Sequence, residues 1–205
     1  MKKGKIRLIV ILFLFPLLLL SACTNRHKAI ENNDRTGKDK TRNYVVYEGV
    51  FLDQDAVLEI AQKIRGDKPA YEKTISNFHV TTAFIPEKDH RDLYGSNVTV
   101  HIIGYKAGEV TIEDGKVTHN EALKVQLKSE DPLMEKCLKE SQEGWHITLS
   151  YEDKAFYTNR MDFSDAQKTD YTLTGVFGAY LNGNYVSYNG DDVDTLISEN
   201  PGPGQ

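Results

Sequence analysis

Two short segments of this 205-residue chain place a threonine two positions after a histidine. They are residues 79–82, with the sequence HVTT, and residues 146–149, with the sequence HITL. Both segments are rich in aliphatic and β-branched side chains and predict strands, in which the histidine and the threonine share one face. An imidazole can take or give a proton near neutral pH, and a hydroxyl can donate a hydrogen bond. Two such pairs facing each other would suit a phosphodiester, where one group takes a proton and another gives one.

The rest of the chain predicts the elements that would position these segments. β-Branched and aromatic residues predict strands, apolar residues at helical spacing predict helices, and aspartates and glycines mark the helix ends. Strands are expected at 44–52, 97–105, 121–128, 171–181 and 185–188, with a hairpin turn at 182–184. Helices are expected at 53–65, capped by Asp53 or Asp55 and ended by Gly66, and from Pro132, capped by Asp131 and ended by Gly144.

The order of these elements repeats. A strand at 44–52, a helix at 53–65 and the His79 strand match a strand at 121–128, a helix at 132–142 and the His146 strand in kind and order. Two such units would relate the histidines by a pseudo-twofold axis and place them on facing lobes.

With both segments in hand, the chain resembles the two-histidine (2H) phosphoesterase superfamily. This group includes RNA 2′,3′-cyclic phosphodiesterases and the phosphodiesterase domains of tRNA ligases, and its signature is histidine, aliphatic, Ser or Thr, aliphatic, present twice. Residues 146–149 fit that signature fully, whereas residues 79–82 depart from it at Thr82. The segment 173–180 (LTGVFGAY) also looks like closing strands of the tRNA-ligase-like branch. The resemblance covers residues 44–188 in element order.

The resemblance implies an α+β fold with two lobes, in which two antiparallel sheets line a central groove and the helices lie outside. It implies metal-independent hydrolysis of cyclic phosphodiesters, such as 2′,3′-cyclic nucleotides or RNA ends, without a cofactor. His79 and His146 would be the catalytic acid and base, in an order that the sequence leaves open. Thr81 and Thr148 would bind the phosphate oxygens. The alternative is a surface-anchored binding module that holds a phosphorylated ligand without turnover.

The N-terminal residues predict export and lipid attachment. Four basic residues precede an apolar run at 8–20, which is too short for a membrane-spanning helix but typical of a secretory signal. The small residues before Cys23 resemble the lipobox of bacterial lipoproteins. This implies a signal peptide at 1–22, a lipid such as palmitate on Cys23, a flexible tether at 23–43 and a domain at 44–188 on the extracytoplasmic face of the cell membrane. The alternative is an uncleaved anchor helix.

Composition limits the class of partner. Loss of residues 1–22 would remove four positive charges and change the net charge from −5 to −9. An acidic chain without a later basic run is poorly suited to binding an extended nucleic acid, so we expect a small phosphoester or an RNA end as substrate. We also expect a monomer. Cys137 lies among apolar residues and is expected in the core. Residues 189–205 are expected to form a loose tail.

Several other side chains remain candidates on sequence alone. Phe156 and Tyr157 could stack on a base or could be ordinary surface aromatics, and His101 could join the site if its strand neighbours the first histidine strand. A zinc site formed by His79, His101 and His146 is the alternative to metal-free chemistry, although no paired-ligand motif is present. Phe84 and Tyr151 follow the histidines by five positions, which predicts the opposite, packed face if the strands are regular. His90 and His119 are expected in solvated loops.

Overall fold

The computed structural model describes residues 45–86, 88–141, 144–181, 185–193 and 195, all within one compact unit. Outside the described residues lie the predicted signal peptide, Cys23 with its tether and the turn at 182–184. Of the tail predicted at 189–205, residue 194 and the residues from 196 onward lie outside them too, whereas Gly190–Asp192 form a 3-10 turn and Val193 is buried. Within the described ranges, no helix has both the length and the apolar character needed to cross a membrane.

Antiparallel strands dominate the described part of the chain, and two α-helices accompany them, so the predicted α+β class is confirmed. The helices are α1 (Gln54–Arg65) and α2 (Pro132–Glu140). The strands are β1 (Val45–Phe51), β2 (Lys73–Thr74), β3 (His79–Phe84), β4 (Asn97–Thr111), β5 (Val117–Lys128), β6 (His146–Tyr151), β7 (Gln167–Leu181) and β8 (Tyr185–Ser187). Single turns of 3-10 helix are η1 (Arg91–Leu93), η2 (Glu113–Gly115) and η4 (Gly190–Asp192), and a longer one is η3 (Ala155–Arg160).

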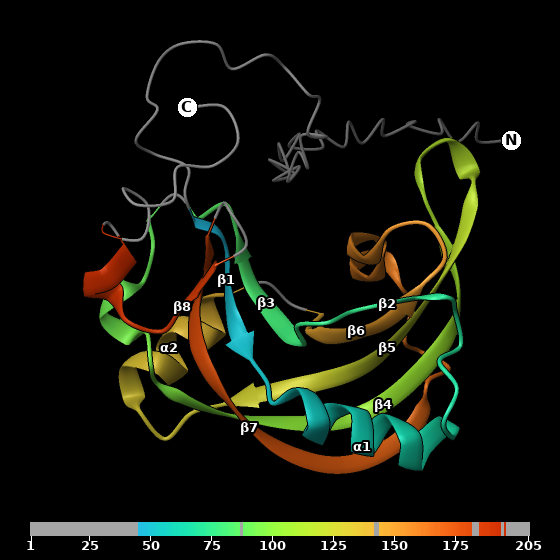
Figure 1. Ribbon diagram of the computed structural model, residues 1–205, viewed down its shortest axis with the longest axis horizontal. Helices are drawn as coiled ribbons and strands as arrows, with labels where there is room; N and C mark the ends of the chain where they lie inside the picture. Colours follow the sequence, from blue (N-terminus) through green and yellow to red (C-terminus); the bar gives the residue numbers. More distant parts are fainter. Residues whose placement is uncertain (1–44, 87, 142–143, 182–184, 194, 196–205) are drawn as a thin grey trace, which may run out of the picture. The chain divides into compact units, whose positions relative to one another are not determined.

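The eight strands form one continuous sheet. Their order is β2-β6-β5-β4-β7-β1-β3, with β8 beside β7, and all pairings are antiparallel. The prediction of two separate sheets is therefore wrong, because the long strands β4 and β7 pair with each other and join both halves. The sheet curves strongly, as twisted sheets of this size do. As a result β3 and β6 come into contact, although they lie near opposite ends of the strand order (Figure 1).

Both helices begin where the sequence predicts. The Asp53 side chain accepts a hydrogen bond from the backbone N–H of Ala56, and the Asp131 side chain caps α2 in the same way. Gly66, with a φ of 86°, follows α1 and donates its N–H to a carbonyl of the last turn, as predicted. α2 ends earlier than predicted, at Glu140, because Ser141 supplies the cap that the sequence analysis assigned to Gly144.

The predicted repeat recurs in the register of the strands. β1 pairs with β3 in the first half as β5 pairs with β6 in the second. Equivalent residues therefore stand opposite the two histidines and the two threonines. In the first half, Phe51, Val50 and Gly49 of β1 stand opposite His79, Val80 and Thr81 of β3. In the second half, Lys124, Leu123 and Ala122 of β5 stand opposite His146, Ile147 and Thr148 of β6.

A β-bulge follows the motif threonine in each half, directly after Thr81 in β3 and after Thr148 in β6. The register skips Thr82 in β3 and Leu149 in β6, which are the fourth residues of the two motifs. A bulge shifts the alternation of side chains by one, so Phe84 stands opposite Tyr47 and returns to the histidine face. Tyr151 returns to that face in the same way, so the prediction that both aromatics pack on the opposite face is wrong. Phe84 is in fact 49% exposed.

The bulge also explains the unusual threonine in the first motif. Thr82 is fully buried, and its hydroxyl donates a hydrogen bond to the backbone carbonyl of Glu48 at 3.1 Å. A buried hydroxyl is tolerated when it finds such an acceptor. Thr82 therefore occupies the buried position that Leu149 fills in the second motif, with its polar atom satisfied.

Two buried glutamates occupy equivalent positions next to these bulges. Glu48 and Glu121 are both 0% exposed, and each stands opposite the residue four positions after a histidine. Each carboxylate fastens a loop to the sheet, and because Glu48 binds His90, that histidine is not simply solvated as predicted. The prediction for His119 is also wrong, since this residue lies within β5 rather than in a loop. The partners of Glu48 are His90 and Tyr94, and those of Glu121 are Arg65, Ala70, Tyr105 and Ser150.

The largest cluster of buried apolar residues lies between the helices and one face of the sheet. α1 contributes Val57, Ile60 and Ala61, and the same cluster contains apolar residues of β1, β3, β4, β5, β6 and β7 together with α2. Cys137 of α2 belongs to this core, as predicted, and burial raises the pKa of its thiol to about 11. A thiol with so high a pKa is inert at neutral pH.

We expect Gly49→Ala to destabilise the fold by about 1–3 kcal/mol, because an added Cβ would lie 2.5 Å from the backbone oxygen of Val80 in the adjacent strand. Gly108→Ala is the matched control, since its Cβ would meet only the flexible end of Lys106, at 3.3 Å. Urea unfolding of both variants measures the difference. Equal stabilities would contradict the close strand approach at Gly49.

Candidate functional site

His79 and His146 begin two strands that contact each other, β3 and β6. The hydrogen bond of Nδ1 is the same in both. Nδ1 of His79 lies 2.8 Å from the backbone oxygen of Asn77, and Nδ1 of His146 lies 2.9 Å from that of Gly144. In both cases the acceptor belongs to the residue two positions earlier. The structure therefore brings together the two predicted histidines in the same local geometry.

This geometry determines which ring nitrogen carries the proton. A peptide carbonyl can only accept a hydrogen bond, so Nδ1 must be the protonated nitrogen in each neutral imidazole. Nε2 of both rings is then left with a free lone pair. Each histidine can take a proton at Nε2 and later give it back, which is the requirement for acid–base chemistry.

Burial lowers the pKa of both imidazoles. It is the largest effect at His79 and at His146, and at His79 the positive charge of His146 lowers the pKa further. The backbone carbonyls beside Nδ1 oppose this effect in part, because they favour the protonated ring. Both histidines are therefore mainly neutral at pH 7, with Nε2 available as a base.

We expect both imidazoles to titrate below the value of about 6.5 typical of unfolded chains. Between that value and the lower pKa of the folded state, the unfolded chain binds more protons than the folded one. The contribution of the histidines to stability is therefore complete above about pH 6.5 and is lost as the pH falls toward the folded-state pKa. NMR titration of the imidazole Hε1 signals measures the two pKa values. Midpoints above 6.5 would contradict the dominant effect of desolvation on the two rings.

Aromatic rings surround His79 but not His146 among the described residues. Tyr47 stacks on the His79 ring, with centroids 4.6 Å apart and planes 19° apart, and Tyr180 stacks on the other side of Tyr47 at 4.9 Å. The centroid of the Phe51 ring lies 5.9 Å from that of the His79 ring, and the Phe51 ring meets the Tyr188 ring edge to face. The Tyr47 hydroxyl lies 3.5 Å from Nδ1 of His79, whose proton is already donated to Asn77, so this contact is weak. Stacking fixes the orientation of the His79 ring.

The two threonines of the motifs differ. The Thr148 hydroxyl lies 3.0 Å from the Thr158 hydroxyl of η3, whereas no described group hydrogen-bonds the hydroxyl of Thr81. Thr158 is in turn bonded to Asn120, which is fully buried. The second half of the site is thus anchored to η3 by polar contacts, while the first half is packed by aromatic rings.

The remaining sequence candidates lie on elements other than β3 and β6, the strands that carry the histidines. His101 is in β4, which borders β5 and β7 rather than β3, and its Nδ1 lies 3.1 Å from the Thr172 hydroxyl. Among the described residues, no three His, Cys, Asp or Glu side chains are grouped closely enough to hold a metal ion. Phe156 is 58% exposed and lies against Tyr157, with centroids 4.3 Å apart. These two rings belong to η3, the same turn that carries Thr158.

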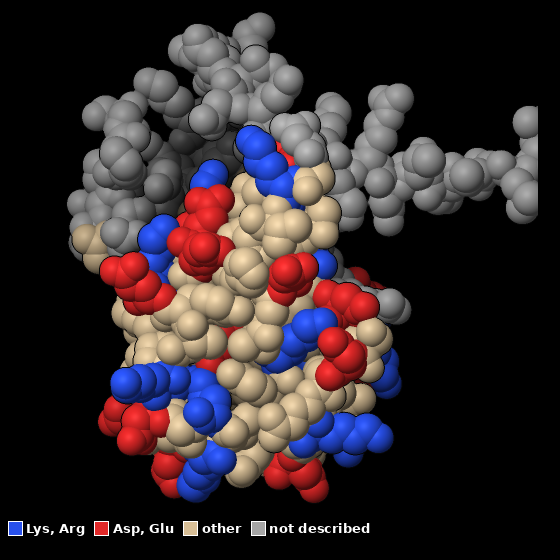
Figure 2. Space-filling view, turned by 90° about the vertical axis from the view of Figure 1, so that its right-hand side faces the viewer, with Lys and Arg blue, Asp and Glu red and all other residues tan. Residues whose placement is uncertain are grey.

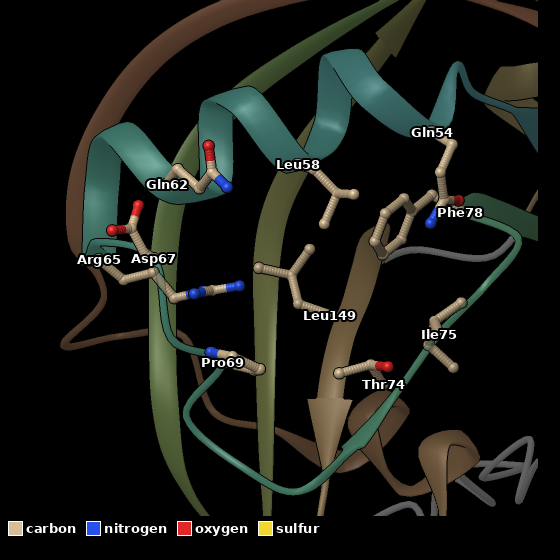
Figure 3. A pocket seen from close by; sticks show the side chains of 10 residues that line it. All are labelled: Gln54, Leu58, Gln62, Arg65, Asp67, Pro69, Thr74, Ile75, Phe78 and Leu149. Carbon is tan, nitrogen blue, oxygen red and sulfur yellow. The ribbon is translucent and has the colours of Figure 1, made fainter.

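A cavity of about 180 Å³ lies on the helix side of the sheet (Figure 3). It opens between α1, the loop after α1 and the Leu149 bulge, with Arg65 and Asp67 at one end and Phe78 at the other. Phe78 precedes His79, but its ring is part of the buried core, so this cavity is separate from the histidine face.

Charged residues of both signs are mixed on the face shown in Figure 2, with blue and red side chains next to each other rather than in separate areas. Among the described residues, several side chains of opposite charge are paired, such as Lys106 with Asp165 and Arg160 with Glu113. A surface of this kind presents no continuous basic area on the side that the figure shows.

Sequence reasoning did not identify the residues that flank the two motifs. The sequence indicates Tyr47 and Tyr180 only as strand residues, and it contains no motif that marks Asn120 or Thr158. The strand pairing places Tyr47 and Asn120 at equivalent positions, opposite Phe84 and Tyr151, which the sequence could not reveal before the bulges were known.

No family model, no curated protein and no solved structure matches this chain.

Proposed function

We propose that the chain is a phosphoesterase of the two-histidine type, which hydrolyses cyclic phosphodiesters such as 2′,3′-cyclic nucleotides or the cyclic phosphates of RNA ends. The observation that carries this proposal is the equivalent placement of His79 and His146. Both rings have Nδ1 tied to a backbone oxygen and Nε2 without a hydrogen bond to any described residue, on strands that contact each other. Two satisfied structural histidines would have no need of this common geometry.

The finer description of the fold is part of the same proposal. Matching registers and matching bulges support a two-lobed arrangement, in which β1, α1 and β3 form one half and β5, α2 and β6 the other. The joined strands β4 and β7 would then lie between the halves. The contact between β3 and β6 would place the two histidines at the junction of the lobes.

The reaction follows from the free Nε2 atoms. One neutral histidine takes a proton from water as the water oxygen attacks phosphorus. The other histidine, protonated at Nε2, gives its proton to the ribose oxygen as the bond from that oxygen to phosphorus breaks. The product is a phosphate monoester, and proton exchange with solvent restores both rings. Thr81 and Thr148, on the same face, would contact the phosphate or the attacking water.

We also propose that lipid on Cys23 tethers the domain to the extracytoplasmic face of the cell membrane. This part of the proposal is supported by the sequence alone, namely by the basic start, the short apolar run and the small residues before Cys23. Mass spectrometry of the mature N-terminus tests it directly. An unmodified Cys23 would contradict it.

The activity is tested by incubating the full-length chain, in mild detergent, with each of the four 2′,3′-cyclic mononucleotides, with and without EDTA. We expect conversion to a nucleoside monophosphate that EDTA does not reduce, because the proposed chemistry uses only imidazoles. Phosphorus NMR of the product shows which ribose oxygen leaves. Binding of the cyclic nucleotide without any product would instead identify a binding module.

A further inference from the structure

The donors and acceptors that contact the Thr158 hydroxyl fix the direction of its three hydrogen bonds. The Thr158 hydroxyl lies 2.8 Å from the backbone oxygen of Ala155, which can only accept, so Thr158 uses its one proton there. The Asn120 amide nitrogen, 2.8 Å away, donates to the Thr158 oxygen. The Thr148 hydroxyl, 3.0 Å away, must then donate to Thr158 as well. Thr158 is 1% exposed, so water does not compete for these bonds.

The orientation of the Asn120 amide is independently determined. Its nitrogen also lies 3.1 Å from the backbone oxygen of Lys154 and 3.3 Å from that of Ala155. Turning the amide over would place its oxygen against these two acceptors, so the nitrogen must face η3. Asn120 is 0% exposed and cannot turn toward solvent. The amide therefore acts as a fixed donor to Thr158.

This network changes what the Thr148 hydroxyl can offer a substrate. Because its proton is committed to Thr158, the Thr148 oxygen presents lone pairs and can only accept a further hydrogen bond. A non-bridging phosphate oxygen is itself an acceptor and would be a poor partner for it. An attacking water molecule, which has protons to donate, is a suitable one. Thr81, whose hydroxyl has no partner among the described groups, keeps its proton for the phosphate.

We propose that Asn120 and Thr158 are positioning residues that make Thr148 the acceptor for the nucleophilic water, so that the two halves of the site have different roles. This inference rests on the phosphoesterase function proposed above. Water is held by Thr148 and by Nε2 of His146, which takes its proton as the water oxygen bonds to phosphorus. His79, protonated at Nε2, gives its proton to the leaving ribose oxygen, and Thr81 donates to a non-bridging oxygen.

Threonine variants of the full-length chain test the inference through kcat, KM and the inhibition constant of inorganic phosphate. Thr148→Val should lower kcat roughly 10 to 100-fold and leave phosphate inhibition unchanged. Thr81→Val should weaken phosphate inhibition by a similar factor, because it removes a donor to the phosphate. Equal weakening of phosphate inhibition in both variants would overturn the inference, since it would show that both threonines donate to phosphate.

Thr158→Val and Thr158→Ser test the positioning role. The serine variant keeps the hydroxyl and should retain wild-type kcat, whereas the valine variant should lower kcat without weakening phosphate inhibition. Thermal unfolding shows whether each variant is folded. A folded Thr158→Val with wild-type kcat would overturn the role of Thr158. If that variant does not fold, the comparison of Thr148→Val with Thr81→Val decides the question.

A change of leaving group separates the roles of the two histidines. A p-nitrophenyl phosphodiester releases an oxygen far more acidic than a ribose hydroxyl and needs little help from an acid. His79→Ala should therefore recover most of its lost rate on this substrate, and His146→Ala should not. The opposite pattern would overturn the inference.

Failure of the function and failure of the inference give different results. Absence of turnover by the wild type on every cyclic phosphate would reject the proposed function. Phosphate binding, followed by the imidazole NMR signals, would still show which threonine donates. Wild-type turnover combined with equal effects of the two threonines would reject the inference alone.

Discussion

Replacing either His79 or His146 with alanine is expected to lower the turnover of a 2′,3′-cyclic nucleotide by roughly 10² to 10⁴-fold. The reason is that each ring supplies one proton transfer, through an Nε2 left free by the bond of Nδ1 to a backbone oxygen. Loss of one transfer is not repaired by the other histidine, because the reaction needs a base and an acid at the same time. The measurement is kcat on purified variants whose folding is checked by thermal unfolding.

His119→Ala is the matched control for these variants. His119 lies in β5 and pairs with Glu152 at 2.7 Å, and alternation along the strand places it on the same face as Glu121, opposite to the face that carries His146. We expect this variant to keep the activity of the wild type. Near-normal turnover in His79→Ala or in His146→Ala would exclude the two-histidine mechanism. Equal loss in His119→Ala would point to a general effect on folding.

The second large effect is expected on stability, in the variant Arg65→Met. Arg65 Nε lies 2.6 Å from Glu121 Oε1, and the Arg65 and Glu121 side chains are 9% and 0% exposed. The side-chain Nε–H of Arg65 is not aligned for a hydrogen bond with Glu121, so the contact is chiefly an attraction between opposite charges. Removal of the guanidinium would leave a buried carboxylate without a cation. We expect a loss of about 3–5 kcal/mol of unfolding free energy, measured by urea titration.

Two further variants show whether the cause is the unpaired charge. Glu121→Gln added to Arg65→Met removes that charge and keeps one acceptor oxygen, for the hydroxyl of Tyr105 or of Ser150, so the double variant should be more stable than Arg65→Met. Lys63→Met breaks an exposed ion pair with Glu59 and should cost far less stability than Arg65→Met. A double variant no more stable than Arg65→Met would assign the loss to packing of the arginine instead.

Local physical rules explain how much of the fold was predictable. The Asp53 and Asp131 caps, the Gly66 helix end and the apolar spacing of α1 depend on neighbours within a few residues, and the structure has them as predicted. The Gly144 prediction was wrong because a closer residue, Ser141, already satisfies the helix end. The two-sheet prediction was wrong for a different reason. Pairing of β4 with β7 joins residues about 70 positions apart, and no local signal reports it.

The candidate site divides in the same way. The sequence by itself determined that His79 and Thr81, like His146 and Thr148, share a strand face, because alternation over two residues is a property of the strand alone. Only the tertiary structure decided that both Nδ1 atoms meet backbone oxygens and that β3 contacts β6. These features depend on how the sheet curves and closes on itself.

The bulges explain why the neighbours of the motif histidines and threonines could not be predicted from the sequence. A single unpaired residue in each strand, Thr82 or Leu149, reverses the face of every side chain after it. It brings Phe84 and Tyr151 to the histidine face and places Tyr47 and Asn120 opposite them. A bulge arises from pairing with another strand, so the chain's own periodicity could not reveal it. The histidines and threonines were therefore readable from the sequence, but their neighbours were decided by the folded sheet.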